Sequence, residues 1–404
     1  MNSTVKSKSP LVHLAYLDGL RAVAALYVVL HHVIVQFDLS KESSTFLKVF
    51  SRPFLYGHYA VDLFIVLSGF CLMLPVVRNK GFLRGGIVRF FKSRTKRILP
   101  PYYVALLLSL ILIFTIIGTK TGTLWDWSLP VTNWDIFSHI LLISDVFENT
   151  AGKINYSFWS ISVEWRIYFL FPLLVILYRK IGALETTILL IALSIVAVIG
   201  LSATTLNTKD YGINPQYVGL FGLGMLSAYV SFSSDNKAKQ LKSMLGWETI
   251  IMLFLISIPL LFVGKYLKSR KIIDDDFPIR DIIFGLCLYA ILAWIAIGKL
   301  SIVRQVLSWK PLVFVGAFAY SIYLIHAPLI QVIWQYILEP LNISLVLSIG
   351  LLLVAGTAVI VALSYLFFLV AERPFINKQP NKLKDPEMVF RNELSDVNNQ
   401  AIAE

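Results

Sequence analysis

Two ionisable side chains lie eleven residues apart in an apolar segment near the N-terminus, YLDGLRAVAALYVVLHH (16–32). In a helix, Arg21 and His32 share one face and are separated by about 16 Å along the axis. A fixed cation and a titratable base on one stripe suit anion binding at one end and proton transfer at the other. A structural alternative is that Asp18 pairs with Arg21 while His32 forms a hydrogen bond with a neighbouring helix. This segment alone favours neither interpretation.

Three further ionisable residues lie within apolar segments. They are Asp62 in HYAVDLFIVLSGF, Glu164 in NYSFWSISVEWRIYFLFP and His326 in FAYSIYLIHAPLI. Such a residue near the middle of a membrane span costs about 2.5–3.5 kcal/mol on insertion scales, so it usually faces a cavity or a partner. The charge of Asp62 therefore needs a reason, and Gly69 in the same segment allows close helix approach. His326, taken by itself, indicates a structural hydrogen bond.

Glu164 belongs to a group with helical spacing, because Ser160, Glu164 and Tyr168 fall on one face four residues apart. An acid surrounded by aromatic residues could orient a histidine or bind sugar hydroxyls. The alternative is an aromatic belt at the headgroups, with Glu164 paired to Arg166 or to another helix. The loop 119–157 also combines tryptophans with acids, which suits either carbohydrate binding or interfacial anchoring.

A basic loop follows the second apolar segment. Residues 78–97 contain eight basic side chains and no acid, which is sufficient as a topology signal. Arg94 and Arg97, three residues apart just before a Pro-Pro helix start, could present their guanidinium groups to a phosphate. This interpretation requires an anionic cytosolic ligand, and anionic lipid headgroups are the competing ligand.

These residues must be positioned by membrane helices. The chain has 404 residues, of which 57% are hydrophobic and 15% are charged, and its mean hydropathy is +0.73. Lipid-exposed backbone must satisfy its own hydrogen bonds, so the sequence predicts an all-α, polytopic transmembrane helix bundle. About ten spans are expected, at residues 14–37, 58–77, 99–118, 158–178, 184–202, 215–231, 246–264, 281–298, 312–336 and 343–369.

The distribution of charge predicts the topology. The net charge is +12, and 23 basic residues fall in the segments that lie inside if the N-terminus is cytoplasmic, against 11 in the outer loops. This bias favours both termini in the cytoplasm and explains the positive charge without a nucleic-acid partner. We therefore expect a cytoplasmic N-terminus (1–13), a membrane domain (14–376) and a disordered cytoplasmic tail (377–404). The two cysteines lie in apolar segments and form no zinc site.

Taken in order, these stretches resemble the acyltransferase-3 family of integral membrane O-acyltransferases. The first segment is similar to the family's basic residue and histidine separated by ten positions, at Arg21 and His32. VDLFIVLSGF resembles the second-helix motif, and Arg94 with Arg97 matches the Arg-x-x-Arg motif. FWSISVEWRIYFLFP, YSIYLIHAPL and AERP (371–374) resemble the later motifs. The resemblance covers about residues 14–375.

The resemblance implies transfer of an acyl group, commonly acetyl, from cytosolic acyl-CoA to a hydroxyl of a cell-surface polysaccharide or other glycan. A thioester carries its own activation, so neither a metal nor a further cofactor is expected. His32 is then predicted to be the base, oriented by Asp62 or Glu164. The phosphates of CoA are expected at Arg94, Arg97 and Arg21.

Several points stay open at this level. The group that stabilises the oxyanion is either His326 or a hydroxyl, and a covalent acyl-enzyme is neither required nor excluded. Many family members carry a fused extracellular hydrolase-like domain. None is expected in this sequence, so we expect the chain to act alone or with a separate partner. The protein is expected to be a multi-pass protein of the cell membrane, in contact with membrane lipids.

Three alternatives compete with this function. The first keeps the chemistry but uses a lipid or small-molecule acceptor. The second is a transporter in which Asp62, Glu164, His32 and His326 form a proton or substrate path. The third is a binding or structural subunit. Flux without consumption of acyl-CoA would indicate the transporter, and an inert His32→Ala variant would indicate the subunit.

Overall fold

The computed structural model describes residues 14–37, 39, 44–206, 211–273 and 275–376, which form helices joined by turns. Within this described part, nine helices are long and apolar enough to cross a membrane. A tenth span results if α9 (Gln216–Phe232) and α10 (Asn236–Ser243), which meet at a 99° bend, are counted as one. The predicted all-α bundle of about ten spans is confirmed. The predicted N-terminal segment 1–13 and tail 377–404 lie outside the described residues.

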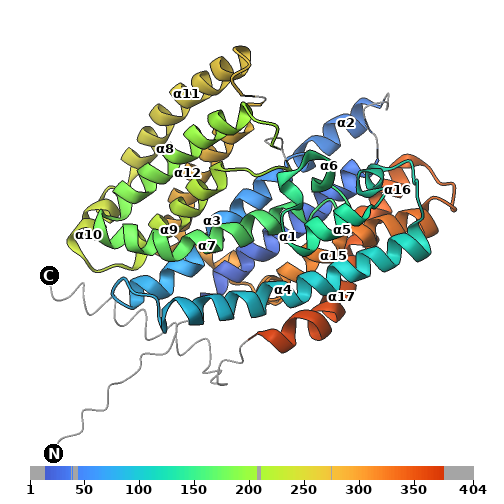
Figure 1. Ribbon diagram of the computed structural model, residues 1–404, viewed down its shortest axis with the longest axis horizontal. Helices are drawn as coiled ribbons and strands as arrows, with labels where there is room; N and C mark the ends of the chain where they lie inside the picture. The colour runs from blue at the N-terminus through green and yellow to red at the C-terminus, as the bar shows by residue number, and fades with distance from the viewer. Residues whose placement is uncertain (1–13, 38, 40–43, 207–210, 274, 377–404) are drawn as a thin grey trace, which may run out of the picture.

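Long helices form the body of the bundle (Figure 1). They are α1 (Ala15–Val35), α3 (His58–Arg78), α4 (Gly86–Leu112), α7 (Trp159–Lys180), α8 (Ala183–Ser202), α9, α11 (Trp247–Ser269), α12 (Phe277–Ala296), α15 (Ala319–Ile333) and α17 (Thr357–Phe367). Shorter helices join or extend them. These are α2 (Thr45–Ser51), α5 (Asn133–Ile140), α6 (Glu148–Ala151), α10, α13 (Ser301–Leu307), α14 (Lys310–Gly316) and α16 (Leu345–Leu351).

Glycines bring α1 into backbone contact with two short helices. A β-carbon at Gly316, the last residue of α14, would overlap with the carbonyl oxygen of Asp18 in α1. A β-carbon at Gly19 would likewise overlap with the carbonyl oxygen of Leu307 in α13. The predicted span 312–336 is thus divided, since α14 ends at this contact and the membrane-length segment begins at Ala319. The contacts fix α1, which carries Arg21 and His32, in place.

A second close approach joins α3 to α9. A β-carbon at Gly69 would overlap with the carbonyl oxygen of Phe221, and one at Gly224 would overlap with that of Val66. The close helix approach predicted at Gly69 is therefore confirmed, and the two glycines interlock the helices from both sides. This interlock sets the position of α3, which supplies one wall of the site described below.

The segment between α4 and α7 folds over one end of the bundle, and we call residues 118–158 the cap. It contains α5, α6 and two short 3-10 helices, Leu124–Ser128 and Ser144–Val146 (Figure 1). Thr123 Oγ1 donates to Gln331 Oε1 of α15 at 2.7 Å, and Gln36 Nε2 donates to the same oxygen at 2.7 Å. Both terminal nitrogens of Arg166 in α7 donate hydrogen bonds to the carboxylate of Asp145. The cap is thereby fastened to α15 and α7.

Candidate active site

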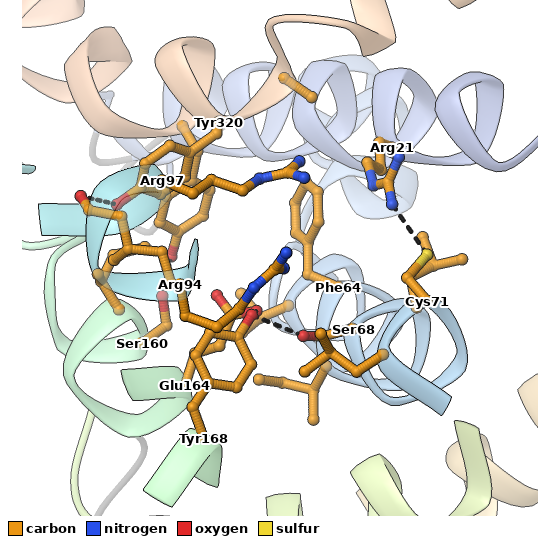
Figure 2. Close-up of a pocket in the computed structure, with 18 of the residues that line it drawn as sticks. Arg21, Phe64, Ser68, Cys71, Arg94, Arg97, Ser160, Glu164, Tyr168 and Tyr320 are labelled. Atoms are coloured by element: carbon orange, nitrogen blue, oxygen red, sulfur yellow. Dashed lines mark hydrogen bonds between the residues drawn. The ribbon is translucent and has the colours of Figure 1, made fainter. Parts of the chain in front are cut away.

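A cavity of about 140 Å³ lies between α1, α3, α4, α7 and α15 (Figure 2). Four of the residues singled out in the sequence line it, namely Arg21, Arg94, Arg97 and Glu164. They come from three helices that are far apart in the chain. A cavity of about 150 Å³ holds a molecule of the size of benzene, so this one has room for one small part of a larger ligand.

Three arginines direct their guanidinium groups into this cavity. Arg94 and Arg97 reach in from α4, and Arg21 approaches from α1 on the opposite side (Figure 2). Arg21 forms an ion pair with Asp18, and its Nη2 donates to Cys71 Sγ at 2.9 Å. Nε of Arg94 is buried without a hydrogen-bond partner. Arg21 thus both pairs with Asp18 and lines the cavity, so the two alternatives for this residue are compatible. The three guanidinium groups together are suited to an anion with several oxygens.

A chain of hydroxyl groups runs along one wall. The Tyr168 hydroxyl donates to Glu164 Oε1 at 2.5 Å and lies 2.8 Å from Ser68 Oγ. Because the single phenol proton is directed at the carboxylate, Ser68 must donate to the phenol oxygen. Ser160, Glu164 and Tyr168 all line the cavity, as their spacing predicts. The alternative pairing of Glu164 with Arg166 does not form, since Arg166 bonds Asp145 instead.

His32 and His326 meet beyond this cavity. His326 Nε2 lies 3.0 Å from His32 Nδ1. The other nitrogen of His326, Nδ1, faces the carbonyl oxygens of Tyr323 at 2.7 Å and Ile322 at 3.2 Å, and therefore carries the proton of the neutral ring. Nε2 of His326 must then accept from His32 Nδ1, which also lies 3.0 Å from the carbonyl oxygen of Val28. We assign His32 the tautomer whose Nε2 bears a lone pair.

Aromatic side chains connect the cavity to this histidine pair. Tyr323 lines the cavity, and its ring centroid lies 5.7 Å from that of His326. Phe64, which also lines the cavity, packs against Tyr323 at 5.8 Å. On its other side, His32 lies 4.9 Å from the ring of Tyr156 in the cap. His32 therefore stands between the arginine-lined cavity and the cap.

This geometry can be compared with known proteins. A family model described as an acyltransferase domain matches residues 14–369. The chain belongs to the acyltransferase-3 family. The resemblance seen in the sequence is confirmed, and this acyltransferase is an integral membrane protein with multiple candidate spans.

Curated relatives are similar over most of the acyltransferase. The "O-acetyltransferase OatA" of Staphylococcus aureus (strain NCTC 8325 / PS 47) is 27% identical over 378 residues, covering 88% of this chain and 56% of OatA. The "Putative peptidoglycan O-acetyltransferase YrhL" of Bacillus subtilis (strain 168) is 24% identical over 339 residues, covering 78% of this chain and 48% of YrhL. The chain thus spans about half the length of these relatives. No solved structure matches it.

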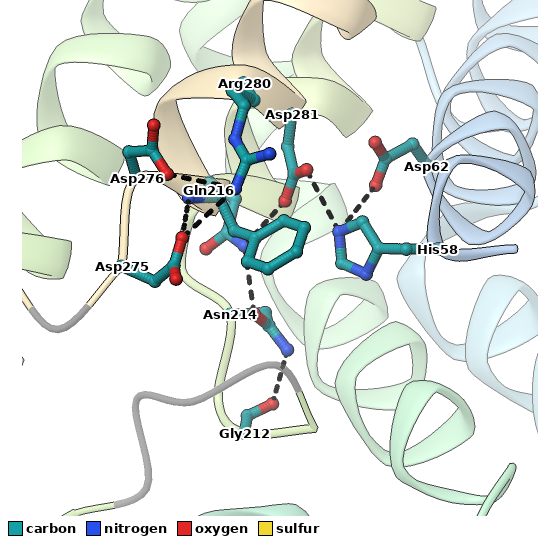
Figure 3. A network of polar contacts seen from close by, with 10 residues as sticks. His58, Asp62, Gly212, Asn214, Gln216, Asp275, Asp276, Arg280 and Asp281 are labelled. Atoms are coloured by element: carbon teal, nitrogen blue, oxygen red, sulfur yellow. Dashed lines mark hydrogen bonds and ion pairs between the residues drawn. The ribbon is translucent and has the colours of Figure 1, made fainter. Parts of the chain in front are cut away.

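Asp62 is the predicted site residue that the acyltransferase fold places elsewhere. Its Oδ1 lies 3.7 Å from His58 Nε2, which is also 3.0 Å from Asp281 Oδ1 (Figure 3). The position beside His32 Nδ1, where we expected a carboxylate, is taken by His326. The structure therefore brings His32 together with His326, and Glu164 together with the arginines, but groups Asp62 with other residues.

Sequence reasoning missed some of the polar cavity residues. Ser68, one residue before Gly69, forms a hydrogen bond with the Tyr168 hydroxyl. Tyr323, which was not assigned to the site, shares a hydrogen bond of 2.6 Å between hydroxyl oxygens with the predicted residue Ser160. Glu372 is buried at the cavity wall and accepts from Ser321 Oγ at 2.6 Å. Its place in the AERP element was the available signal, because a carboxylate at the end of a span needs a partner.

Proposed function

We propose that this protein transfers an acyl group, most simply acetyl, from cytosolic acyl-CoA to a hydroxyl of a cell-surface polysaccharide or other glycan. The observation that carries the proposal is the arrangement along α1: an arginine-lined cavity at one level and the His32–His326 pair at the next. The two ends of this stripe, Arg21 and His32, are about 16 Å apart along the helix axis. The phosphate-binding arginines and the base are thus separated along the helix, as a CoA donor requires, because its pantetheine arm separates the phosphates from the thioester.

The arginine cluster is the proposed donor site. Arg94, Arg97 and Arg21 bind the phosphates of CoA, because guanidinium groups match phosphate oxygens in number and geometry. The pantetheine arm then runs through the cavity and past Phe64 and Tyr323, so that the thioester carbonyl reaches His32. In this arrangement the basic segment 78–97 and both termini lie in the cytoplasm, and the cap lies outside the cell membrane.

His32 acts as the general base in the proposed reaction. Its Nε2 takes the proton of the acceptor hydroxyl while the hydroxyl oxygen attacks the thioester carbonyl carbon. The tetrahedral intermediate collapses with cleavage of the carbon–sulfur bond, and the thiolate of CoA takes the proton from His32. The products are the glycan ester and free CoA. His326 holds the base in its active tautomer by accepting from Nδ1.

The glycan acceptor is supported by the relatives and by the cap. OatA is named as an O-acetyltransferase, and the name of YrhL specifies peptidoglycan. In the cap, Trp127 and Trp134 are exposed, and such aromatic faces suit sugar rings. Tyr156 connects the cap to His32. An extracytoplasmic acceptor would therefore approach the base from this side.

The test uses membrane vesicles that contain the full chain. Vesicles are given acetyl-CoA labelled in the acetyl group on the cytoplasmic side, together with cell-wall glycan on the other side. We expect label on the glycan that mild alkali releases, as expected for an ester, and labelling at least about 100-fold slower with the His32→Ala variant. Alkali-stable label, label confined to lipid, or equal transfer by His32→Ala would contradict the proposal.

A further inference from the structure

A second buried polar cluster lies away from the acyl-transfer cavity. It consists of His58 and Asp62 on α3 and Asp281 on α12 (Figure 3). One ligand atom from each of the three residues can be chosen so that all lie within 4.8 Å of one another. Both aspartate side chains are fully buried, whereas the His58 side chain is 18% exposed and gives the cluster a route to the surface.

The cluster has more negative charge than its contacts balance. Neither carboxylate oxygen of Asp62 has a well-formed hydrogen bond, although the side chain is completely buried, and the nearby Tyr217 hydroxyl likewise lacks a well-formed one. The nearby guanidinium of Arg280 is directed at Asp275 and Asp276 instead, at 3.1 and 2.9 Å (Figure 3). His58 can neutralise at most one of the two aspartates. A buried, unpartnered carboxylate beside a second one is costly in a low-dielectric interior unless a cation is added.

We propose that His58, Asp62 and Asp281 bind a divalent cation of the Zn²⁺ class. One imidazole nitrogen with two carboxylate oxygens is a donor set that Zn²⁺ accepts, and two carboxylates balance its charge. Tetrahedral bonds of 2.0–2.1 Å separate neighbouring ligand atoms by about 3.3 Å. The distances from His58 Nε2 to Asp281 Oδ1 and Asp62 Oδ1, 3.0 and 3.7 Å, lie on either side of this value. The ligand oxygens of Asp62 and Asp281, which lie within 4.8 Å of each other, would have to approach to about this separation to complete the site.

The surroundings already orient one ligand. Gln216 Nε2 donates to Asp281 Oδ2 at 3.0 Å, and also to Asn214 Oδ1 at 2.9 Å, which leaves Asp281 Oδ1 directed at His58. Gln216 begins α9, so the cation would join α3 to α12 with α9 supporting the joint. The three protein ligands leave the fourth tetrahedral position for a water, and the site is independent of the proposed acyl transfer. Gln216 is accordingly a positioning residue.

The test is metal content and metal binding of the full chain in detergent. We expect purified protein to contain about one equivalent of Zn²⁺ by mass spectrometry, or to bind one equivalent of added ZnCl₂ in calorimetry after treatment with a chelator. Asp62→Asn and His58→Gln should each lose this binding. Asp275→Asn, which removes a partly exposed carboxylate nearby, should retain it. Size-exclusion elution identical to wild type establishes that the variants are folded.

The supporting residue gives a second, graded readout. Gln216→Ala should weaken Zn²⁺ binding by about 10- to 100-fold without abolishing it, the usual effect of losing a residue that orients a ligand. Absence of Zn²⁺ binding by wild type overturns the proposal and leaves a proton shared between the aspartates as the explanation. Unchanged binding by both Asp62→Asn and His58→Gln overturns it as well, because the metal would then lie elsewhere.

Discussion

The His32–His326 pair makes a quantitative prediction, because the two rings have different proposed roles. Removing the base with His32→Ala should lower the transfer rate by about 10²- to 10⁴-fold, the usual contribution of general-base catalysis. At about 1.36 kcal/mol per tenfold, this loss corresponds to about 2.7–5.4 kcal/mol of transition-state stabilisation. The alanine variant keeps the donor cavity, so the KM for acyl-CoA should change little.

Removing the supporting ring should cost much less. His326→Leu deletes the acceptor 3.0 Å from His32 Nδ1, but the carbonyl oxygen of Val28, also at 3.0 Å, continues to hold that proton. One hydrogen bond contributes about 0.5–1.5 kcal/mol, which predicts a loss of about twofold to tenfold. His326→Gln can restore an acceptor and should recover part of the rate. His31→Gln, which alters the neighbouring ring bonded to Phe54, serves as the matched control.

The assay is the initial rate of alkali-labile acetyl transfer to glycan in vesicles that contain equal amounts of each variant. The double variant His32→Ala/His326→Leu should be no slower than His32→Ala alone, because His326 acts only by orienting the His32 ring. The reasoning is refuted if His326→Leu loses as much activity as His32→Ala while His32→Ala/His326→Leu falls further still. His326 would then take part in the chemistry directly.

Three other predictions concern separate parts of the molecule. Arg94→Gln/Arg97→Gln should raise the KM for acyl-CoA by about tenfold or more and leave the KM for acceptor unchanged; equal changes in both would contradict the phosphate site. Gly69→Ala should lower the melting temperature in detergent through about 1–3 kcal/mol of overpacking against α9, whereas Gly200→Ala, in open space, should not. Burial lowers the pKa of His139 in α5 to about 4. Between pH 6.5 and 4 the unfolded cap therefore binds more protons than the folded cap does. The free energy of unfolding of the cap should fall as the pH falls through this range. Hydrogen exchange in α5 should show this loss in wild type and not in His139→Gln.

The sequence predicted the bundle and part of the site for distinct physical reasons. Apolar composition predicts the membrane spans, and helical periodicity places Ser160, Glu164 and Tyr168 on one face of a helix. Contacts within one helix were therefore accessible. Contacts between helices were not, because spacing along one helix contains no information about which neighbour faces it. His326 acquires its partner from a helix 294 residues away, and Asp62 lies in one cluster with Asp281 of α12.

The interlocked glycines of α3 and α9 have a consequence for how a group could cross this membrane. Two helices whose backbones touch at Gly69 and Gly224 cannot slide or rock past each other without a steric collision. Any rearrangement of the bundle would therefore move α3 and α9 together, as one unit, against the other helices.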